Sequence, residues 1–128
     1  MKPEDLLVKR VSTYLSTVYS DIPFRFDLFA DQVTTIGVAR KNKALHGKWN
    51  RGYPDLIVLQ ATKKYGALFI ELKATKTVVN SEHTRRQRAY HEYLRLRGYK
   101  ADFACGFEEA KKQIDAYMQL KKKKVKTR

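Results

Sequence analysis

Two short apolar runs separated by a polar turn constrain the fold of this chain most. They occupy residues 54–59 (PDLIVL) and 67–73 (ALFIELK), and residues 60–66 between them include two lysines and a glycine. Short runs rich in Leu, Ile, Val and Phe are typical of β-strands, and a short polar connection that contains glycine joins strands into a hairpin. Because the first run is apolar throughout after Asp55, we expect its strand to be buried on both faces. The sequence therefore predicts a buried hairpin.

Further elements are expected on both sides of the hairpin. Leu7, Val11, Leu15 and Val18 recur at three- and four-residue steps, which predicts a helix over residues 4–20. Alternation in FRFDLF predicts a strand over residues 24–29. Residues 30–52 carry many cations and no apolar period, so we expect a long basic loop with at most one helical turn.

After the hairpin, helix signals and one strand signal alternate. The predicted elements are a helix over residues 82–97 with Ser81 as its N-cap and Gly98 as its terminator, a strand over residues 99–105, and a helix over residues 107–120. The fourth strand follows a helical crossover, which favours a parallel partner. The chain is therefore expected to be an α/β sandwich.

Size and charge restrict the class of protein. The 128 residues, 43% hydrophobic and 31% charged, predict one globular domain over residues 1–120, followed by a disordered basic tail over residues 121–128. The net charge of +14 indicates a polyanionic partner, with nucleic acid as the leading candidate. The single cysteine excludes an internal disulfide, and no apolar stretch reaches the length of a membrane span, so we expect a cytoplasmic protein without membrane contact.

The second strand of the hairpin carries two charged residues on one face. Strand periodicity places Glu71 and Lys73 on the face opposite Leu72. If the hairpin register brings Asp55 beside Glu71, two carboxylates meet at the rim of an apolar sheet, where only a cation or a donor makes them tolerable. Mg²⁺ or Mn²⁺ accepts such carboxylates and leaves room for phosphate oxygens, while Lys73 points at the same volume. An edge strand with a solvated ion pair is the alternative for Glu71 and Lys73.

These residues carry a resemblance to a known family. GYPDLIVL at residues 52–59, LFIELK at residues 68–73 and Gln87 on the next helix resemble the PD-(D/E)xK nuclease superfamily and, within it, virus-type VRR-NUC domains. The resemblance implies a restriction-endonuclease-like αβββαβα core with a mixed four-stranded sheet flanked by helices. It also implies metal ligation by Asp55, Glu71 and the Leu72 carbonyl, a water-activating Lys73, and support from Gln87. Glu4 matches a further acidic ligand of the family, although it equally suits the start of a helix.

Basic residues on both sides of this site are candidates for phosphate contacts. They are Lys41, Lys43, Lys48 and Arg51 in the basic loop, Lys76 after the hairpin, and Arg85, Arg86 and Arg88 on the following helix. A solvated basic helix face is the alternative for the arginines. Trp49 either stacks on a base or packs the loop down, and His83 and His91 are interpreted as surface or substrate-contacting residues.

The sequence as a whole predicts a metal-dependent endonuclease that hydrolyses DNA. We expect a structure-specific enzyme for branched DNA, such as four-way junctions or flaps, because the chain carries no separate recognition domain. The resemblance implies a DNA repair role like that of Holliday-junction resolvases, a homodimer, and a viral or mobile-element origin inside a bacterial host. The alternatives are a non-catalytic nucleic-acid-binding protein, which explains the charge equally well, and a restriction-type nuclease, which would need more sequence for base recognition.

Overall fold

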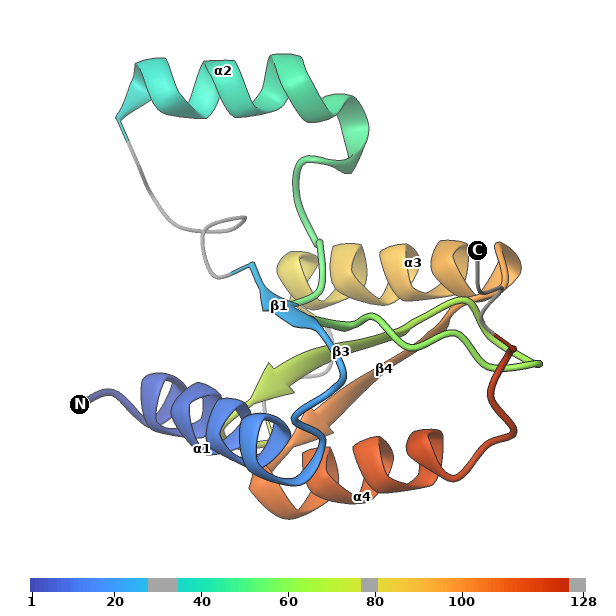
Figure 1. Ribbon diagram of the computed structural model, residues 1–128. Coiled ribbons are helices and arrows are strands. Elements are labelled where there is room, and N and C mark those ends of the chain that lie inside the picture. Colours follow the sequence, from blue (N-terminus) through green and yellow to red (C-terminus); the bar gives the residue numbers. More distant parts are fainter. Residues whose placement is uncertain (28–34, 77–80, 125–128) are drawn as a thin grey trace.

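The fold is one four-stranded sheet between two layers of helices. The computed structural model describes residues 1–27, 35–76 and 81–124. The described elements are α1 (Pro3–Val18), β1 (Phe24–Phe26), α2 (Ile36–His46), the 3-10 helix η1 (Gly47–Trp49), β2 (Leu56–Val58), β3 (Leu68–Lys73), α3 (Glu82–Leu96), β4 (Lys100–Cys105) and α4 (Gly106–Met118). The strand order is β1-β2-β3-β4 (Figure 1). Adjacent pairs are antiparallel except β3 and β4, which are parallel. The α/β class and the mixed four-stranded sheet are confirmed.

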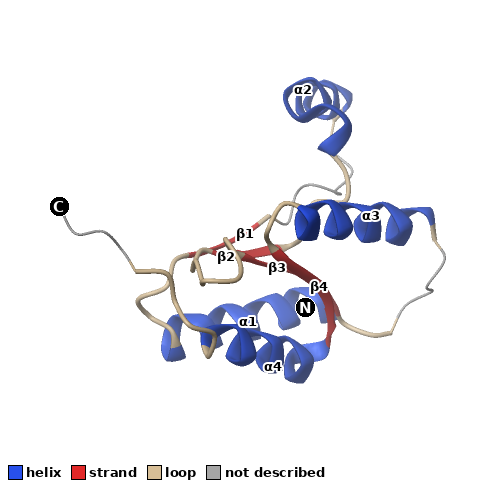
Figure 2. Ribbon diagram, turned by 90° about the vertical axis from the view of Figure 1, so that its right-hand side faces the viewer, coloured by secondary structure: helices blue, strands red, loops and turns tan. Residues whose placement is uncertain are grey.

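The sheet separates two apolar clusters. On one face, Leu56, Ile70 and Leu72 pack against α1 and α4; on the other, Ala67 and Phe69 pack under α3 (Figure 2). Consecutive β3 side chains therefore alternate between the two layers, as strand periodicity requires. The side chains of Glu71 and Lys73 are on the same face of β3 as that of Phe69, so they lie on the α3 side of the sheet. This face holds the candidate site.

The expectation of a long loop over residues 30–52 is wrong for its second half. Residues 36–46 form α2, a helix of 11 residues, with η1 directly after it. The Thr35 side chain caps α2 by accepting a hydrogen bond from Val38 N at 3.3 Å. Within the described part of the chain no residue of α2 is buried, so the helix leaves no apolar period in the sequence. Its Ala, Lys, Arg and Leu residues favour a helix through local propensity alone.

Other element boundaries agree with the sequence to within a few residues. Ser81 caps α3 through a hydrogen bond from Thr84 N at 3.1 Å, and Gly98 follows the helix at φ 94°. β1 ends at Phe26, and the expected extension through Leu28 and Phe29 lies outside the described residues. The start of the basic tail runs beside residues 61–63, where Lys63 N donates to Lys121 O, whereas residues 125–128 lie outside the described chain. No helix in the described ranges has both the length and the apolar character to cross a bilayer.

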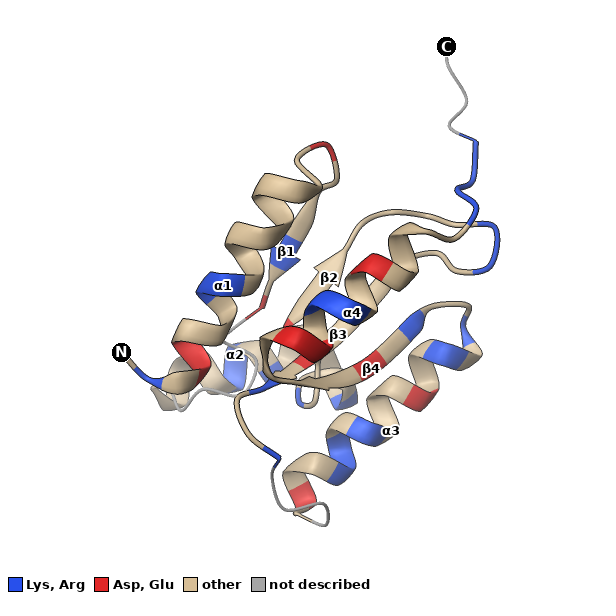
Figure 3. Ribbon diagram, turned by 90° about the horizontal axis from the view of Figure 1, so that it is seen from below, with Lys and Arg blue, Asp and Glu red and all other residues tan. Residues whose placement is uncertain are grey.

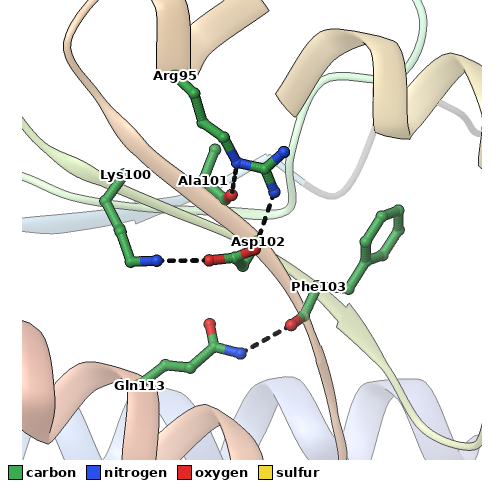
Figure 4. A network of polar contacts seen from close by, with 6 residues as sticks. All are labelled: Arg95, Lys100, Ala101, Asp102, Phe103 and Gln113. Carbon is green, nitrogen blue, oxygen red and sulfur yellow. Dashed lines mark hydrogen bonds and ion pairs between the residues drawn. The ribbon is translucent and has the colours of Figure 1, made fainter. Parts of the chain in front are cut away.

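Side chains from two helices cover the outer edge of β4 (Figure 4). Arg95 Nε on α3 donates to Ala101 O at 2.9 Å, and Gln113 Nε2 on α4 donates to Phe103 O at 2.7 Å. Asp102 accepts from both Arg95 and Lys100, at 2.8 and 2.7 Å. Two carbonyls of this edge strand are thereby satisfied by side chains instead of by another strand.

Candidate active site

The hairpin register brings the two candidate carboxylates together. Leu56 pairs with Ile70, and continuing this antiparallel register by one residue sets Asp55 opposite Glu71. Asp55 lies just before β2, where its Oδ2 accepts a hydrogen bond from Leu72 N at 2.8 Å, and its main-chain oxygen accepts from Asp27 N at 2.7 Å. The Asp55 carboxylate is thus fixed to β3 beside Glu71. This arrangement is the geometry on which the expected cation site depends.

The side-chain amide of Gln87 connects two further candidate catalytic residues, Glu71 and Lys73. Gln87 on α3 is 2% exposed and donates from Nε2 to the carboxylate of Glu71, which is 1% exposed. Its Oε1 accepts a hydrogen bond from Lys73 Nζ at 2.9 Å. The acceptor end of the amide therefore faces the cation, and the donor end faces the anion, as electrostatics requires.

His83 also lies at this amide, which the sequence did not assign to the site. His83 Nε2 is 3.1 Å from Gln87 Nε2. Because that amide nitrogen can only donate, the contact is satisfied when His83 Nε2 is the acceptor. The four-residue spacing from His83 to Gln87 on one helix face was the available signal.

Glu4 is not brought to the carboxylate pair by any described contact. It is exposed in the first turn of α1, the helix that covers the opposite face of the sheet. Across residues 1–27, 35–76 and 81–124, no three or more His, Cys, Asp or Glu side chains gather as they would around a metal ion. The oxygen ligands that the described site offers are therefore the carboxylates of Asp55 and Glu71 and the main chain around Leu72.

The interpretation of His91 as a surface or substrate-contacting residue is wrong. His91 is fully buried beneath α3, 4.5 Å from the Phe103 ring, and its two ring nitrogens have no hydrogen-bond partner among the described residues. Burial lowers the pKa of His91 to about 4; Arg95 and Lys73 act in the same direction, and Asp102 opposes them. His91 is therefore neutral at physiological pH. Its burial follows from the crossing of α3 over β4, which the sequence does not display.

The expected phosphate contacts fall into two groups. Lys43, Lys48, Arg51 and Arg86 line one hollow of about 670 Å³ between α2, η1 and α3, together with Arg40. The remaining candidates, Lys41, Lys76, Arg85 and Arg88, are exposed outside the lining of this hollow. Basic residues also lie along α3 (Figure 3). Arg40 was not among the predicted phosphate contacts, because in the sequence it is one of many basic residues between 30 and 52 and nothing there distinguishes it from the others.

Trp49 packs η1 onto α3, as the interpretation that it packs the basic loop down predicts. Its ring centroid is 4.2 Å from that of Tyr93 and 4.9 Å from that of Tyr90. Three residues beyond η1, Gly52 lies against the α3 backbone at φ 84°, where an added Cβ would be 3.0 Å from Arg86 O. The basic segment is thus held against α3 at Arg86, Tyr90 and Tyr93, on the same helix that carries Gln87.

Solved structures with the same fold are known. One, a "VRR_NUC domain protein", is 24% identical with a TM-score of 0.66 and matches 95% of this chain and 93% of its own. A second, a "VRR_NUC domain", is 19% identical with a TM-score of 0.53 and matches 91% of this chain and 99% of its own. No family model and no curated protein matches the sequence. The chain therefore shares the fold of VRR_NUC domain structures along nearly its whole length.

Proposed function

We propose that this chain is a VRR-NUC nuclease of the PD-(D/E)xK superfamily, a metal-dependent endonuclease that hydrolyses DNA phosphodiester bonds. The observation that carries the proposal is the placement of Asp55 opposite Glu71, with Lys73 on the same face and bonded through Gln87 to Glu71. The net charge of +14 and the cationic hollow beside α3 support a polyanionic substrate. The shared fold with VRR_NUC domain structures supports the same assignment.

The ligand chemistry of the site suits a hard divalent cation. Its donors are two carboxylates and main-chain oxygen, with no thiol and no imidazole among those assigned. Mg²⁺ and Mn²⁺ accept such sets and retain several waters, which phosphate oxygens can replace. We assign the ligand role to Asp55, Glu71 and the Leu72 carbonyl; the ligand role of Glu4 stays a prediction that no described contact supports. When bound, the cation would polarise the phosphate and lower the pKa of a bound water.

The protein side chains would orient the reaction. Hydrolysis adds a water oxygen to phosphorus and breaks one ester P–O bond; the water loses a proton and the departing sugar oxygen gains one. The Lys73 ammonium would hold the water and offset the negative charge that develops on the phosphate oxygens. Gln87 would keep Lys73 in place through the 2.9 Å hydrogen bond and hold the Glu71 carboxylate toward the site.

Cleavage of matched DNA substrates tests the proposal. An end-labelled four-way junction, a flap and a linear duplex of the same sequence are incubated with Mg²⁺, Mn²⁺ or chelator. We expect metal-dependent cleavage that falls at least about 100-fold in Asp55→Asn and Lys73→Gln, while DNA binding by anisotropy is retained. Lys112→Gln, an exposed α4 lysine on the opposite face, is the control for loss of one charge. Binding without cleavage by the wild-type protein would instead favour a non-catalytic DNA-binding protein.

Branched DNA is the proposed substrate class, and a homodimer is the proposed assembly. A twofold dimer would present two sites of opposite direction, which suits paired cuts across a junction. Sedimentation velocity with and without junction DNA measures the assembly. Equal cleavage of the junction and the linear duplex would contradict the substrate class without contradicting the nuclease.

A further inference from the structure

Two hollows lie side by side between the α2–η1 segment and α3. They have volumes of about 670 and 610 Å³ and share Trp49, Asn50 and Tyr90 in their linings. Trp49 is the only tryptophan of the chain and is half-buried where the two hollows meet. The two hollows therefore meet at two aromatic side chains, those of Trp49 and Tyr90.

The first hollow is cationic. Its described lining contains five basic residues and no acidic residue, namely Arg40, Lys43, Lys48, Arg51 and Arg86. Arg86 is partly engaged by an ion pair with Glu82 at 2.6 Å, whereas Lys43 and Arg51 form no ion pair with another described residue. Such a concentration of like charge is unfavourable by itself and becomes favourable when phosphate groups bind.

The second hollow combines flat rings with hydrogen-bonding groups. Trp49, Tyr53 and Tyr90 supply the rings, and Asp27, Asn42 and Asn50 supply polar groups. Burial and the Asp27 carboxylate raise the pKa of the Tyr53 phenol, so Tyr53 remains a hydrogen-bond donor. Rings beside amides and a carboxylate form the type of surface on which an unpaired nucleobase stacks and pairs its edge.

Residues that neighbour the candidate site residues line both hollows. Tyr53 precedes Asp55 by two residues, and Asp27 N is bonded to Asp55 O at 2.7 Å. On α3, Arg86 lines the cationic hollow while the next residue, Gln87, faces Glu71 and Lys73. A nucleotide bound here would therefore lie beside the segments that carry Asp55 and Gln87. A base inside a duplex remains stacked and paired, so only an unpaired nucleotide can enter a hollow of this kind at low cost.

We propose that these two hollows bind one unpaired nucleotide of the DNA strand beside the cut, with its base in the aromatic hollow and its phosphates in the cationic hollow. This inference rests on the proposed nuclease function and names the feature of branched DNA that the enzyme recognises. The recognised feature is an unpaired nucleotide at the branch, not the crossing of helices as such.

Trp49 fluorescence tests the inference without any cleavage. The wild-type protein in chelator is titrated with a single-stranded decamer, the same decamer with abasic sites throughout, and the corresponding duplex. We expect quenching of Trp49 by the single strand, and little quenching by the abasic strand at equal bound fraction, because it has the phosphates without the bases. Anisotropy of labelled DNA gives the bound fraction in each case.

Two exposed or half-buried positions of α2 provide the variants. Asn42→Ala in the aromatic hollow and Lys43→Gln in the cationic hollow should together weaken single-strand binding about ten-fold or more. Lys112→Gln, on α4 at the opposite face, should leave binding within about two-fold. Circular dichroism verifies that α2 remains folded in the double variant.

The outcomes separate this inference from the proposed function. Equal quenching by duplex, abasic and intact strands, or unchanged single-strand affinity of the Asn42→Ala/Lys43→Gln variant, would overturn the inference. Metal-dependent cleavage accompanied by either result would leave the nuclease standing and remove only the nucleotide site. Quenching confined to the intact single strand, in a protein that cuts no substrate, would remove the nuclease and retain the nucleotide site.

Discussion

The side-chain carbonyl of Gln87 accepts a hydrogen bond from Lys73 Nζ at 2.9 Å, and this contact crosses from α3 to the end of β3. The same amide donates to the buried carboxylate of Glu71. One neutral residue thus satisfies an anion and a cation on the same strand. Without it, Glu71 would lose a hydrogen-bond donor at a buried position, and Lys73 would lose its described restraint.

Replacing Gln87 should therefore affect both activity and stability. Gln87→Leu leaves the Glu71 carboxylate without this donor, which should cost about 1–3 kcal/mol of unfolding free energy. Cleavage should fall about 10- to 100-fold, mainly in kcat, because Lys73 is no longer held. Urea unfolding and single-turnover cleavage measure the two effects. Gln113→Leu, which removes only the hydrogen bond to Phe103 O, is the matched control and should lose stability without a loss in kcat.

Divalent cations should stabilise the folded protein through Asp55. A ligand that binds the folded state raises the unfolding free energy by mass action, about 2.7 kcal/mol at a hundred times its Kd. We expect Mn²⁺ to raise the thermal midpoint of the wild-type protein and to have little effect on Asp55→Asn. Differential scanning calorimetry with a Mn²⁺ series and an EDTA reference measures this shift. A wild-type-like shift in the variant would contradict the ligand role of Asp55.

The stability of the protein should fall in mild acid because of His91. Its pKa is about 4 in the folded state, against 6.5 for the unperturbed side chain. As the pH falls from 6.5 toward 4, the unfolded chain binds a proton at His91 that the folded chain does not, so the unfolding free energy decreases, by about 3 kcal/mol over the window. His91→Leu removes this dependence, so the difference in stability between the variant and the wild-type protein should shift in favour of the variant between pH 7.5 and pH 4.5. Urea unfolding at the two pH values provides the measurement, and parallel curves would exclude the assignment.

Gly52 should tolerate no side chain. Its φ of 84° is costly for any L-residue with a Cβ, and that Cβ would meet the backbone oxygen of Arg86 at 3.0 Å. Gly52→Ala should therefore destabilise the protein by about 1–3 kcal/mol and loosen the segment that carries Trp49 from α3. The near-ultraviolet circular dichroism of the Trp49–Tyr93 contact should weaken. Gly37→Ala is the control, because nothing lies within 4 Å of its added Cβ and its φ is not positive.

The core of the fold was readable because its signals are local. Strand alternation in residues 67–73 assigned Glu71 and Lys73 to one face, and the apolar layers in the structure confirm this division. The proximity of Asp55 and Glu71 was conditional on the register of the hairpin, because a one-residue shift would place the two side chains on opposite faces; the structure provides that register. The roles of these residues in catalysis stay predictions.

The features that the sequence did not predict arise from tertiary contacts or from their absence. α2 has no buried residue in the described chain, so no apolar period in the sequence indicated a helix there. The burial of His91 depends on how α3 crosses β4, and a lone histidine on a helix gives no sign of such a crossing. The two hollows require η1 and α3 to come together through Trp49 and Gly52, residues that are 34 to 44 positions from their α3 partners.

The covered edge of β4 limits how copies of this chain can associate. Adding a strand there would displace the hydrogen bonds that Arg95 and Gln113 donate to Ala101 O and Phe103 O. The Arg95 guanidinium would also leave Asp102, a carboxylate that it helps to keep ionised. Continuous sheets through β4 are therefore disfavoured, which protects this very basic protein from edge-to-edge aggregation at high ionic strength, where charge repulsion is screened.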